Sequence, residues 1–334
     1  MNNPTIGRWA PLGLLLAFTL ASKAQWFDQG PVFSLTEEND TLTRTDRHYT
    51  QGFKLSYLHT DNAIPVWLRK LSEAIPAWGF DPRATRIGTQ VGQNIYTPTD
   101  LKASQLVTND RPYAGWLYTG FILQRRGLTS NDRPTLESFQ MDIGVVGPES
   151  LAEEAQDWAH SLEIQGWHNQ LNTEFGLSLK YYRAWLFTQK RSGPRKFDFI
   201  PHAGISLGNI DTSFRAGGTL RLGINLPDDF GVQTINSLAT SEGGMSRREG
   251  GRWGIYTFAD AEGSAVAYNE FIDGTLYRDS HHVKREPLVA ELKCGLVLVS
   301  PHADVGATFA WRSDEFTTQS SWDVYGSLYV KVKL

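Results

Sequence analysis

The 334-residue sequence contains one cysteine, three methionines and, beyond its first 24 residues, no long apolar run. The single cysteine, Cys294, excludes an internal disulfide framework, so stability must come from packing and hydrogen bonds. A membrane-spanning helix needs about 20 predominantly apolar residues, and no segment after residue 24 approaches that length. These absences leave two classes, a secreted soluble protein and a protein that crosses a membrane with β-strands.

The N-terminal segment predicts export. A basic residue precedes the apolar run Trp9 to Ala21, and Ser22-Lys23-Ala24 follows as a small-x-small cleavage site. We expect residues 1–24 to be a signal peptide and residues 25–334 to form one barrel domain. An uncleaved anchor is the alternative, but this apolar core is shorter than a spanning helix requires.

The sequence has no excess of positive charge. Cleavage after residue 24 removes two basic residues and no acid, so the 32 Lys and Arg residues fall to 30 against 36 Asp and Glu, a net charge of −6. A nucleic-acid partner is recognised through a basic surface. We therefore expect no nucleic-acid partner.

The period of the apolar pattern separates the two remaining classes. The last candidate strand places Leu328, Val330, Val332 and Leu334 on one face and polar or amphipathic residues on the other. Strands of a membrane barrel alternate in this way over about ten residues, with one face toward lipid and one toward the lumen. Twelve long extended segments are predicted, at residues 32–38, 48–59, 85–97, 113–126, 135–147, 174–188, 196–208, 212–225, 252–266, 286–299, 303–313 and 322–334.

An even strand count suits a closed antiparallel barrel, and closure leaves no unpaired sheet edge in lipid. The 11 Trp, 12 Tyr and 17 Phe residues include many near predicted strand ends, where interfacial aromatic girdles lie. A soluble β-sandwich also alternates, but its strands usually run about 5 to 6 residues. We predict an all-β fold, a twelve-stranded antiparallel transmembrane outer-membrane β-barrel.

Two segments do not fit the wall. Residues 62–80 show an irregular helical spacing and predict a helical loop outside the wall. Ser150-x-x-Glu153 is a capping box after a strand, so we predict an inserted helix over residues 150–163. Gln156 and His160, four residues apart, share one face of this helix. A different face is predicted to carry the apolar stripe, formed by Leu151, Ala155, Trp158 and Leu162.

Three blocks in sequence order resemble the motifs of the outer-membrane lipid A 3'-O-deacylase family. They are "FSLTEENDTLTRTDRHYTQGFKLSY", "NIYTPTDLKASQLVTNDRPYAGWLYTG" and "MDIGVVGPESLAEEAQDWAHSLEIQGWHNQL", and together they span roughly residues 32–175. The resemblance implies a twelve-stranded barrel in the bacterial outer membrane. It also implies a calcium-dependent esterase site that faces the outer leaflet, with the short inserted helix beside it.

The family's functional positions can be placed on this sequence. By this resemblance His160 is the general base, and Gln156, one helical turn earlier, holds it in register. Asn39 and Asp40 match the family's Asn-Asp pair, which is associated with the metal and the oxyanion, and Thr50 matches the Thr of its Tyr-Thr-x-Gly strand. From composition alone, Asn39 and Asp40 also fit the start of a turn.

Two further residues are candidates for substrate binding. Lys102 matches, more loosely, a basic position of the family that contacts substrate. Arg111 belongs to the Asp-Arg-Pro-Tyr-Ala-Gly block, whose proline marks the start of a strand. The guanidinium of Arg111 could also pair bidentately with a lipid A phosphate.

The chemistry explains this set of residue types. An imidazole with a pKa near 6.5 is suited to take a proton from water at neutral pH. A hard cation such as Ca²⁺ prefers oxygen ligands and can neutralise the charge on the tetrahedral intermediate, and Asn39, Asp40 and, as an auxiliary, Glu38 offer such oxygens. The pattern Gly-x-Ser-x-Gly occurs only at residues 204–208, inside a predicted strand and not at the strand-to-helix turn of a nucleophile elbow, so a serine nucleophile has little support.

We therefore expect a carboxylic ester hydrolase that uses Ca²⁺ to cleave the 3'-linked acyloxyacyl ester of lipid A in lipopolysaccharide. We expect a monomer surrounded by outer-membrane lipids. One alternative is an outer-membrane phospholipase A with the same site chemistry. Another is a barrel that passes solutes or serves structure and has no hydrolytic activity.

Overall fold

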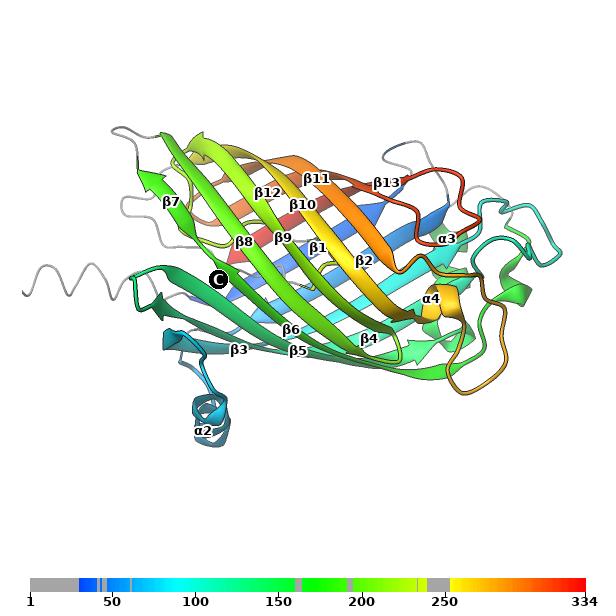
Figure 1. Cartoon of the computed structure of the whole chain (residues 1–334), viewed down its shortest axis with the longest axis horizontal. Helices are drawn as coiled ribbons and strands as arrows, with labels where there is room; N and C mark the ends of the chain where they lie inside the picture. The colour runs from blue at the N-terminus through cyan, green and yellow to red at the C-terminus, as the bar shows by residue number, and fades with distance from the viewer. Residues whose placement is uncertain are drawn as a thin grey trace, which may run out of the picture.

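The computed structural model describes residues 30–40, 43, 47–60, 62–159, 164–190, 195–232, 234–238 and 253–334. The predicted signal peptide, His160 and Leu162 lie outside these described residues. The chain forms a β-barrel (Figure 1) whose elements are β1 (Val32–Asn39), β2 (His48–Leu58), α2 (Val66–Ala74), β3 (Phe80–Thr97), β4 (Ala114–Thr129), β5 (Pro134–Val146), η2 (Pro148–Ser150), α3 (Ala152–Ala159), η3 (Trp167–Asn169), β6 (Glu174–Trp185), β7 (Phe187–Lys190), β8 (Arg195–Gly208), β9 (Asp211–Ile224), β10 (Gly254–Asn269), α4 (Glu270–Asp273), β11 (Leu288–Val299), β12 (Ala303–Arg312) and β13 (Asp323–Lys333).

The barrel is closed and antiparallel. Neighbouring strands pair in chain order, β1 pairs with β13, and β6 pairs with β8. The segments β6 and β7 are separated only by Leu186 and both pair with β8, so they form one wall strand. The thirteen strand segments of the described residues therefore make twelve wall strands, and the predicted fold is confirmed.

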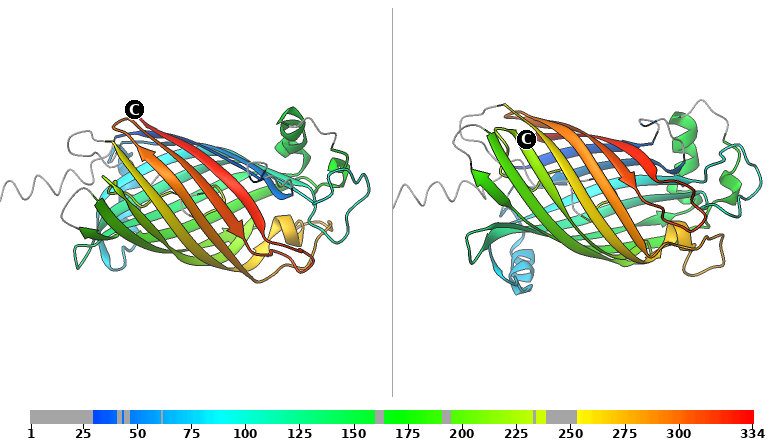
Figure 2. Two further views of the ribbon diagram at one scale, coloured as in Figure 1. Left: turned by 90° about the horizontal axis from the view of Figure 1, so that it is seen from above. Right: turned by 45° about the horizontal axis from the view of Figure 1, so that its top comes forward.

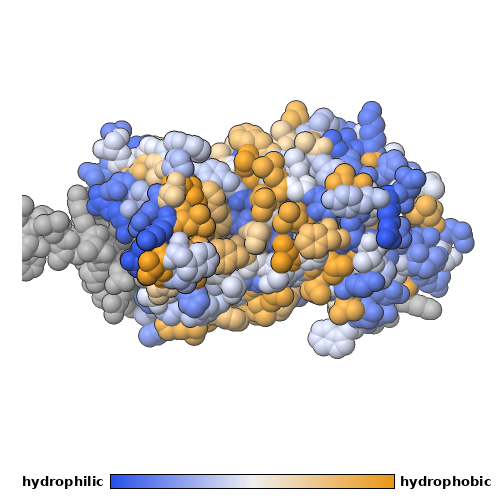
Figure 3. Space-filling view, turned by 90° about the horizontal axis from the view of Figure 1, so that it is seen from below, coloured by the Kyte–Doolittle hydropathy of each residue, from blue (hydrophilic) through white to orange (hydrophobic). Residues whose placement is uncertain are grey.

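Alternation along the strands separates a polar lumen from an apolar outer face. In β1, Ser34, Thr36 and Glu38 are buried in the lumen, whereas Phe33 and Glu37 are exposed on the outside. Figure 3 shows the outer face that is turned to the viewer, with hydrophobic side chains gathered over the middle of the barrel and hydrophilic ones toward its two ends. This band is the surface that a membrane barrel presents to lipid.

A segment between β9 and β10 folds back into the lumen. The backbone amide of Ile235 donates to Glu38 Oε1 at 2.8 Å, and Asn94 Nδ2 donates to Asn236 Oδ1 at 3.1 Å. Arg215 Nη1 donates to the carbonyl of Asn236 at 2.7 Å. We call residues 234–238 the lumenal plug, because they pack between opposite sides of the wall.

The helices lie at the two ends of the barrel. Figure 2 shows α3 and α4 at the end opposite to the C-terminus, while α2 lies outside the wall at the same end as the C-terminus. The structure confirms a helical loop within residues 62–80, as α2. None of the helices in the described part of the chain is both long and apolar enough to cross a bilayer.

The second predicted helix differs from the structure. Leu151 has a positive φ of 57°, so α3 begins at Ala152 rather than at Ser150, and it extends to Ala159 within the described residues. The predicted apolar stripe is wrong, because Leu151 is 52% and Trp158 91% exposed. Instead, Ala152 and Gln156 are fully buried, and because they lie four residues apart they share one face of the helix.

Candidate functional site at the outer rim

The helix α3 packs on the outer face of the barrel, beside the rim opposite to the chain's C-terminus (Figure 2). Ala152 belongs to an apolar cluster with Ile95 of β3, Tyr113 and Trp167. A side chain at Gly115 of β4 would overlap Ala152, so the glycine is needed for this close approach. Gln93, two residues before Ile95 on β3, donates from its side chain to the carbonyl of Ser150 at 2.6 Å. These contacts fix the start of α3 against β3 and β4.

Gln156 is fully buried between α3 and the loop that follows it. Its Oε1 accepts a hydrogen bond from Trp167 Nε1 at 2.9 Å. Its Nε2 is buried and has no hydrogen-bond partner among the described residues. A buried amide donor without a partner costs about 1–3 kcal/mol. One end of the amide is therefore fixed by Trp167, and the other end is available to a further group.

The rim of β1 and β2 carries the second part of the predicted site. The Asp40 amide donates to the carbonyl of Thr50 at 3.4 Å, so these two residues are direct neighbours. Asn39 pairs with Gln51 in the β1–β2 register and, by alternation, lies on the outer face with Glu37. The pairing of β2 with β3 shifts register between Tyr49 and Gln51, which leaves Thr50 in a β-bulge. Bulges re-aim side chains and are common next to active sites.

The bulged Thr50 is joined to β3. Its Oγ1 lies 2.8 Å from Oγ1 of Thr97, and both side chains are fully buried. By alternation Thr97 lies on the same outer face of β3 as Ile95 and Gln93, which contact the α3 region. Of the residues predicted for the site, Asn39, Asp40, Thr50 and Gln156 thus lie on neighbouring elements around one rim, from the end of β1 to the helix that carries Gln156.

Asp40 is held in a turn, as one of its two sequence interpretations predicts, and its role as a metal ligand stays a prediction. Its carbonyl accepts from the Thr43 amide at 2.9 Å, and its Oδ2 accepts from the Arg47 amide at 2.6 Å. The adjacent His48 is buried with a positive φ of 64°. His48 Nδ1 lies 2.7 Å from an oxygen of Asp323, which ties the start of β2 to β13.

The other ring nitrogen of His48 faces the loop between β3 and β4. Nε2 lies 3.3 Å from Asp110 Oδ1 and 3.1 Å from Thr99 Oγ1. Burial alone would raise the pKa of Asp110, but hydrogen bonds from His48 and from the amides of Thr99 and Arg111 lower it to about 2. Asp110 is therefore ionised at neutral pH and holds this loop against the rim.

The donors at the end of β1 fit a hard cation in type. The carboxylate of Asp40, buried at the rim, and the amide oxygen of Asn39 are the oxygen ligands that Ca²⁺ prefers. Within the described residues, no group of three or more His, Cys, Asp or Glu side chains converges as a metal cluster. Glu38 is not placed with them, because its carboxylate faces the lumen and accepts from Tyr49 and Ile235. Asn39 and Asp40 are thus the two candidate ligands at this position.

The two candidate substrate-binding residues differ in exposure. Lys102 is exposed in the loop between β3 and β4, and its amide donates to Asp100 Oδ1 at 3.0 Å. Arg111 is fully buried, donates to Glu315 Oε2 at 3.2 Å and lies over the Tyr96 ring at 4.8 Å. This placement gives Arg111 a structural role at the start of β4, while a phosphate contact stays a prediction for both residues.

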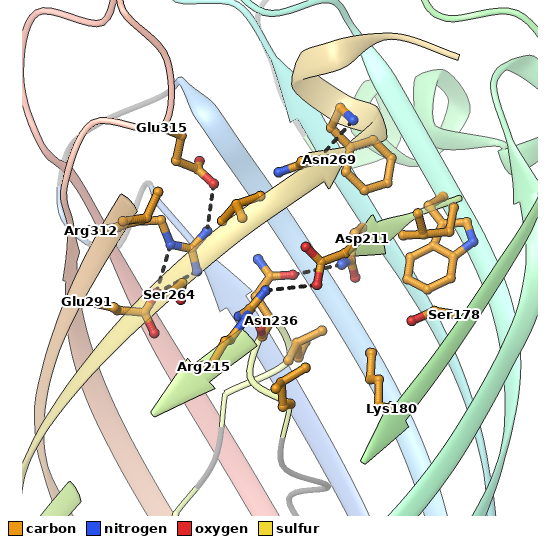
Figure 4. Close-up of a pocket in the computed structure, with 18 of the residues that line it drawn as sticks. Ser178, Lys180, Asp211, Arg215, Asn236, Ser264, Asn269, Glu291, Arg312 and Glu315 are labelled. Carbon is orange, nitrogen blue, oxygen red and sulfur yellow. Dashed lines mark hydrogen bonds and ion pairs between the residues drawn. The ribbon is translucent and has the colours of Figure 1, made fainter. Parts of the chain in front are cut away.

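A second candidate site lies inside the barrel. A cavity of about 80 Å³ is bounded by the lumenal plug and α4 (Figure 4). Its charged residues neutralise one another: Arg312 Nη2 lies 2.5 Å from Glu291, and Arg215 Nη2 lies 3.3 Å from Asp211. A cavity of this size holds a few water molecules. The plug, α4 and mutually neutralised side chains thus bound a small cavity at this level of the lumen.

Several residues around the outer site were not singled out from the sequence. Trp167, Thr97 and Gln93 act through contacts with Gln156, Thr50 and Ser150 that join segments distant in the chain. The only sequence feature that could have indicated these three residues is their position in or beside the blocks that resemble the family motifs. Pairing partners across strands cannot be read from one sequence without the register.

Comparisons with known proteins agree with this architecture. A family model described as outer membrane protein LpxR matches residues 12–334. The solved structure of LpxR from Salmonella typhimurium is similar with a TM-score of 0.71 and 20% identity, over 91% of this chain and 100% of that one. The β-domain of the Bordetella autotransporter BrkA gives a TM-score of 0.45 and 7% identity, over 92% of this chain and 100% of that one.

A comparison with curated proteins finds no match. The family model, however, covers almost the whole length of the chain, including all twelve wall strands. The chain therefore belongs to the LpxR family of outer membrane proteins.

Proposed function

We propose that the protein is a calcium-dependent esterase that removes the 3'-linked acyloxyacyl group of lipid A in the outer leaflet. Its membership of the LpxR family supports a lipid A-modifying function in the outer membrane. One observation carries the finer proposal: Asn39, Thr50 and Gln156 gather around one rim on the outer side of the barrel, and Asp40 adjoins them at the end of β1. A site on the outer face receives its substrate sideways from the membrane.

The proposed reaction is the attack of a water molecule on the ester carbonyl. His160, four residues after Gln156 in sequence, takes the proton of that water and returns it to the leaving alkoxide. Gln156 is a positioning residue, because Trp167 fixes its amide and leaves Nε2 available to orient the base or the water. Asn39 and Asp40 would hold Ca²⁺, which supplies positive charge to the developing oxyanion.

The surroundings of α3 suit an acylated substrate. Leu151 and Trp158 are exposed beside the outer face, so apolar side chains border the site where acyl chains lie. An exposed tryptophan at a membrane interface places its ring among lipid headgroups. The exposed Lys102, in the loop between β3 and β4, is the proposed partner of a lipid A phosphate.

Mass spectrometry of lipid A incubated with the detergent-purified protein tests this function. With Ca²⁺ we expect the loss of one acyloxyacyl unit, and with a chelator no loss. His160→Ala and Asp40→Ala should abolish the loss, whereas His282→Ala, an exposed histidine of another loop, should keep it. Normal activity of either site variant would remove that residue from the mechanism.

The substrate class is tested in the same assay with phosphatidylethanolamine vesicles. We expect no release of fatty acid from them. Release from phosphatidylethanolamine without any mass loss from lipid A would replace the proposal with a phospholipase A. No hydrolysis of either lipid by the folded barrel would refute an enzymatic function.

A further inference from the structure

The helix α2 lies against the outside of the barrel at the end opposite to the candidate site. Figures 1 and 2 show it crosswise to the long axis of the barrel, beside the start of β3. Leu68 and Ser72, four residues apart, face the wall and are buried. Trp67 and Leu71 are more than half exposed although they are large and apolar. A helix in this orientation, with an exposed apolar side, is typical of the membrane interface.

A buried arginine on the outer wall fixes α2 in place. Arg125 of β4 donates from Nη1 to the carbonyls of Ser72 at 2.9 Å and Ile75 at 2.7 Å. The same guanidinium forms an ion pair with Glu137 of β5. Cations near the last carbonyls of a helix are stabilising. These contacts fix the end of α2 and the residues after it against the wall.

A groove runs between α2 and the wall. It has a volume of about 350 Å³ and its described lining is almost entirely apolar. The β4–β8 register places one row of outward residues across its floor, formed by Phe121, Met141, Leu179 and Leu207. Leu68 and Leu71 of α2 form the opposite side. The groove opens on the same outer face that the barrel presents to lipid.

A row of charged side chains lies four residues beyond the apolar row on the same strands, toward the end of the barrel where α2 lies. The register aligns Arg125, Glu137 and Arg183 on neighbouring strands, about 13 Å from the apolar row at 3.3 Å per residue. Arg125 and Glu137 neutralise each other, but Arg183 has no carboxylate partner among the described residues. Its guanidinium stacks over the Phe80 ring at 4.6 Å. One positive charge is therefore left at the edge of the apolar surface.

We propose that this groove is a binding site for one glycerophospholipid of the leaflet on the side of the chain's C-terminus. One acyl chain lies between α2 and the row that contains Met141 and Leu179. The phosphate lies at the row of charged side chains and pairs with Arg183. Two observations select this occupant. The groove continues the lipid-facing surface, and Arg183, whose buried Nε and Nη2 have no hydrogen-bond partner among the described residues, lies four residues beyond the groove floor, where a headgroup phosphate would lie.

Native mass spectrometry of the detergent-solubilised barrel, titrated with phosphatidylethanolamine, tests the site. Leu179→Trp fills the groove, and Leu296→Trp is the matched control, because Leu296 is similarly exposed on the outer face of β11. We expect Leu179→Trp to weaken the binding of one phosphatidylethanolamine about tenfold or more and Leu296→Trp to leave it unchanged. Equal weakening by both variants, or none by Leu179→Trp, would overturn the proposal.

The headgroup contact is tested separately with Arg183→Gln. This variant should bind phosphatidylethanolamine about tenfold more weakly, which is the contribution of one charge-assisted hydrogen bond to the affinity. It should bind oleic acid as the wild type does. Unchanged phosphatidylethanolamine binding would refute the role of Arg183. Folding is checked by the shift in gel mobility between unheated and boiled samples. Deacylation of lipid A takes place at the other rim, so Leu179→Trp should leave its rate unchanged.

Discussion

Replacing Gln156 with leucine separates a role in the reaction from a role in packing. The substitution removes a buried Nε2 that has no described partner, and this raises the free energy of unfolding by about 1–3 kcal/mol. It also leaves Trp167 Nε1 without its acceptor, and this lowers the free energy of unfolding by a similar amount. Because the two effects offset each other, Gln156→Leu should melt within a few degrees of the wild type. If the amide orients the base or the water, the loss of one such hydrogen bond lowers kcat about 10 to 100-fold.

The assay is the initial rate of acyl release from lipid A as a function of substrate concentration and pH. A positioning role predicts that kcat falls more than KM changes and that the pH profile of the remaining activity shifts. Gln170→Leu, a partly buried glutamine at the end of η3, is the matched control and should retain the wild-type rate. Wild-type kcat in Gln156→Leu, or an equal loss in Gln170→Leu, would refute the reasoning.

Two further predictions concern stability. Arg125→Leu should lower the free energy of unfolding by about 3–5 kcal/mol, because it leaves the buried carboxylate of Glu137 without its ion-pair partner. Adding Glu137→Leu should recover part of that loss. A double variant no more stable than the single one would contradict the pairing. Burial, together with the charge of Glu174, raises the pKa of Glu270 in α4 from 4.5 to about 8. The folded state therefore binds the extra proton, and its stability falls by up to about 5 kcal/mol as pH rises from 4.5 through 8. Melting temperatures at pH 5 and pH 9 should differ less in Glu270→Gln than in the wild type, and an equal difference would refute this assignment.

The wall could be predicted from the sequence because the bilayer imposes a simple rule on each strand. Lumen-facing and lipid-facing residues alternate, as in β13, and this pattern persists over ten or more residues. The predicted strands agree with the structure to within a few residues. The largest difference is in β3, which begins at Phe80 rather than at residue 85. Two further strands end three residues later than predicted, since β4 extends to Thr129 rather than 126 and β10 to Asn269 rather than 266. All three extensions lie beyond the predicted ends, where the polar and apolar pattern becomes irregular.

The site and the plug could be predicted only in part, because their geometry depends on contacts between distant segments. The bulge at Thr50 breaks the alternation by one residue, which a periodic pattern does not reveal. The buried face of α3 was assigned from its apolar residues, but near lipid an exposed Trp158 carries little penalty and a buried Gln156 can be satisfied by Trp167. The lumenal plug shows no periodicity, since its place is set by Glu38 and Asn94.

Two consecutive residues of β1 show how the lumen supports the outer site. Glu38 points inward and accepts from the plug amide of Ile235, whereas Asn39 points outward at the rim. On β3, Asn94 points inward to the plug residue Asn236, and the next residue, Ile95, packs outward under α3. The plug therefore contacts, from inside, the same two strands that carry the two parts of the site outside. Because consecutive residues of a barrel strand face the lumen and the outside in turn, contacts in the lumen fix the position of the same strands that carry a site on the outer face.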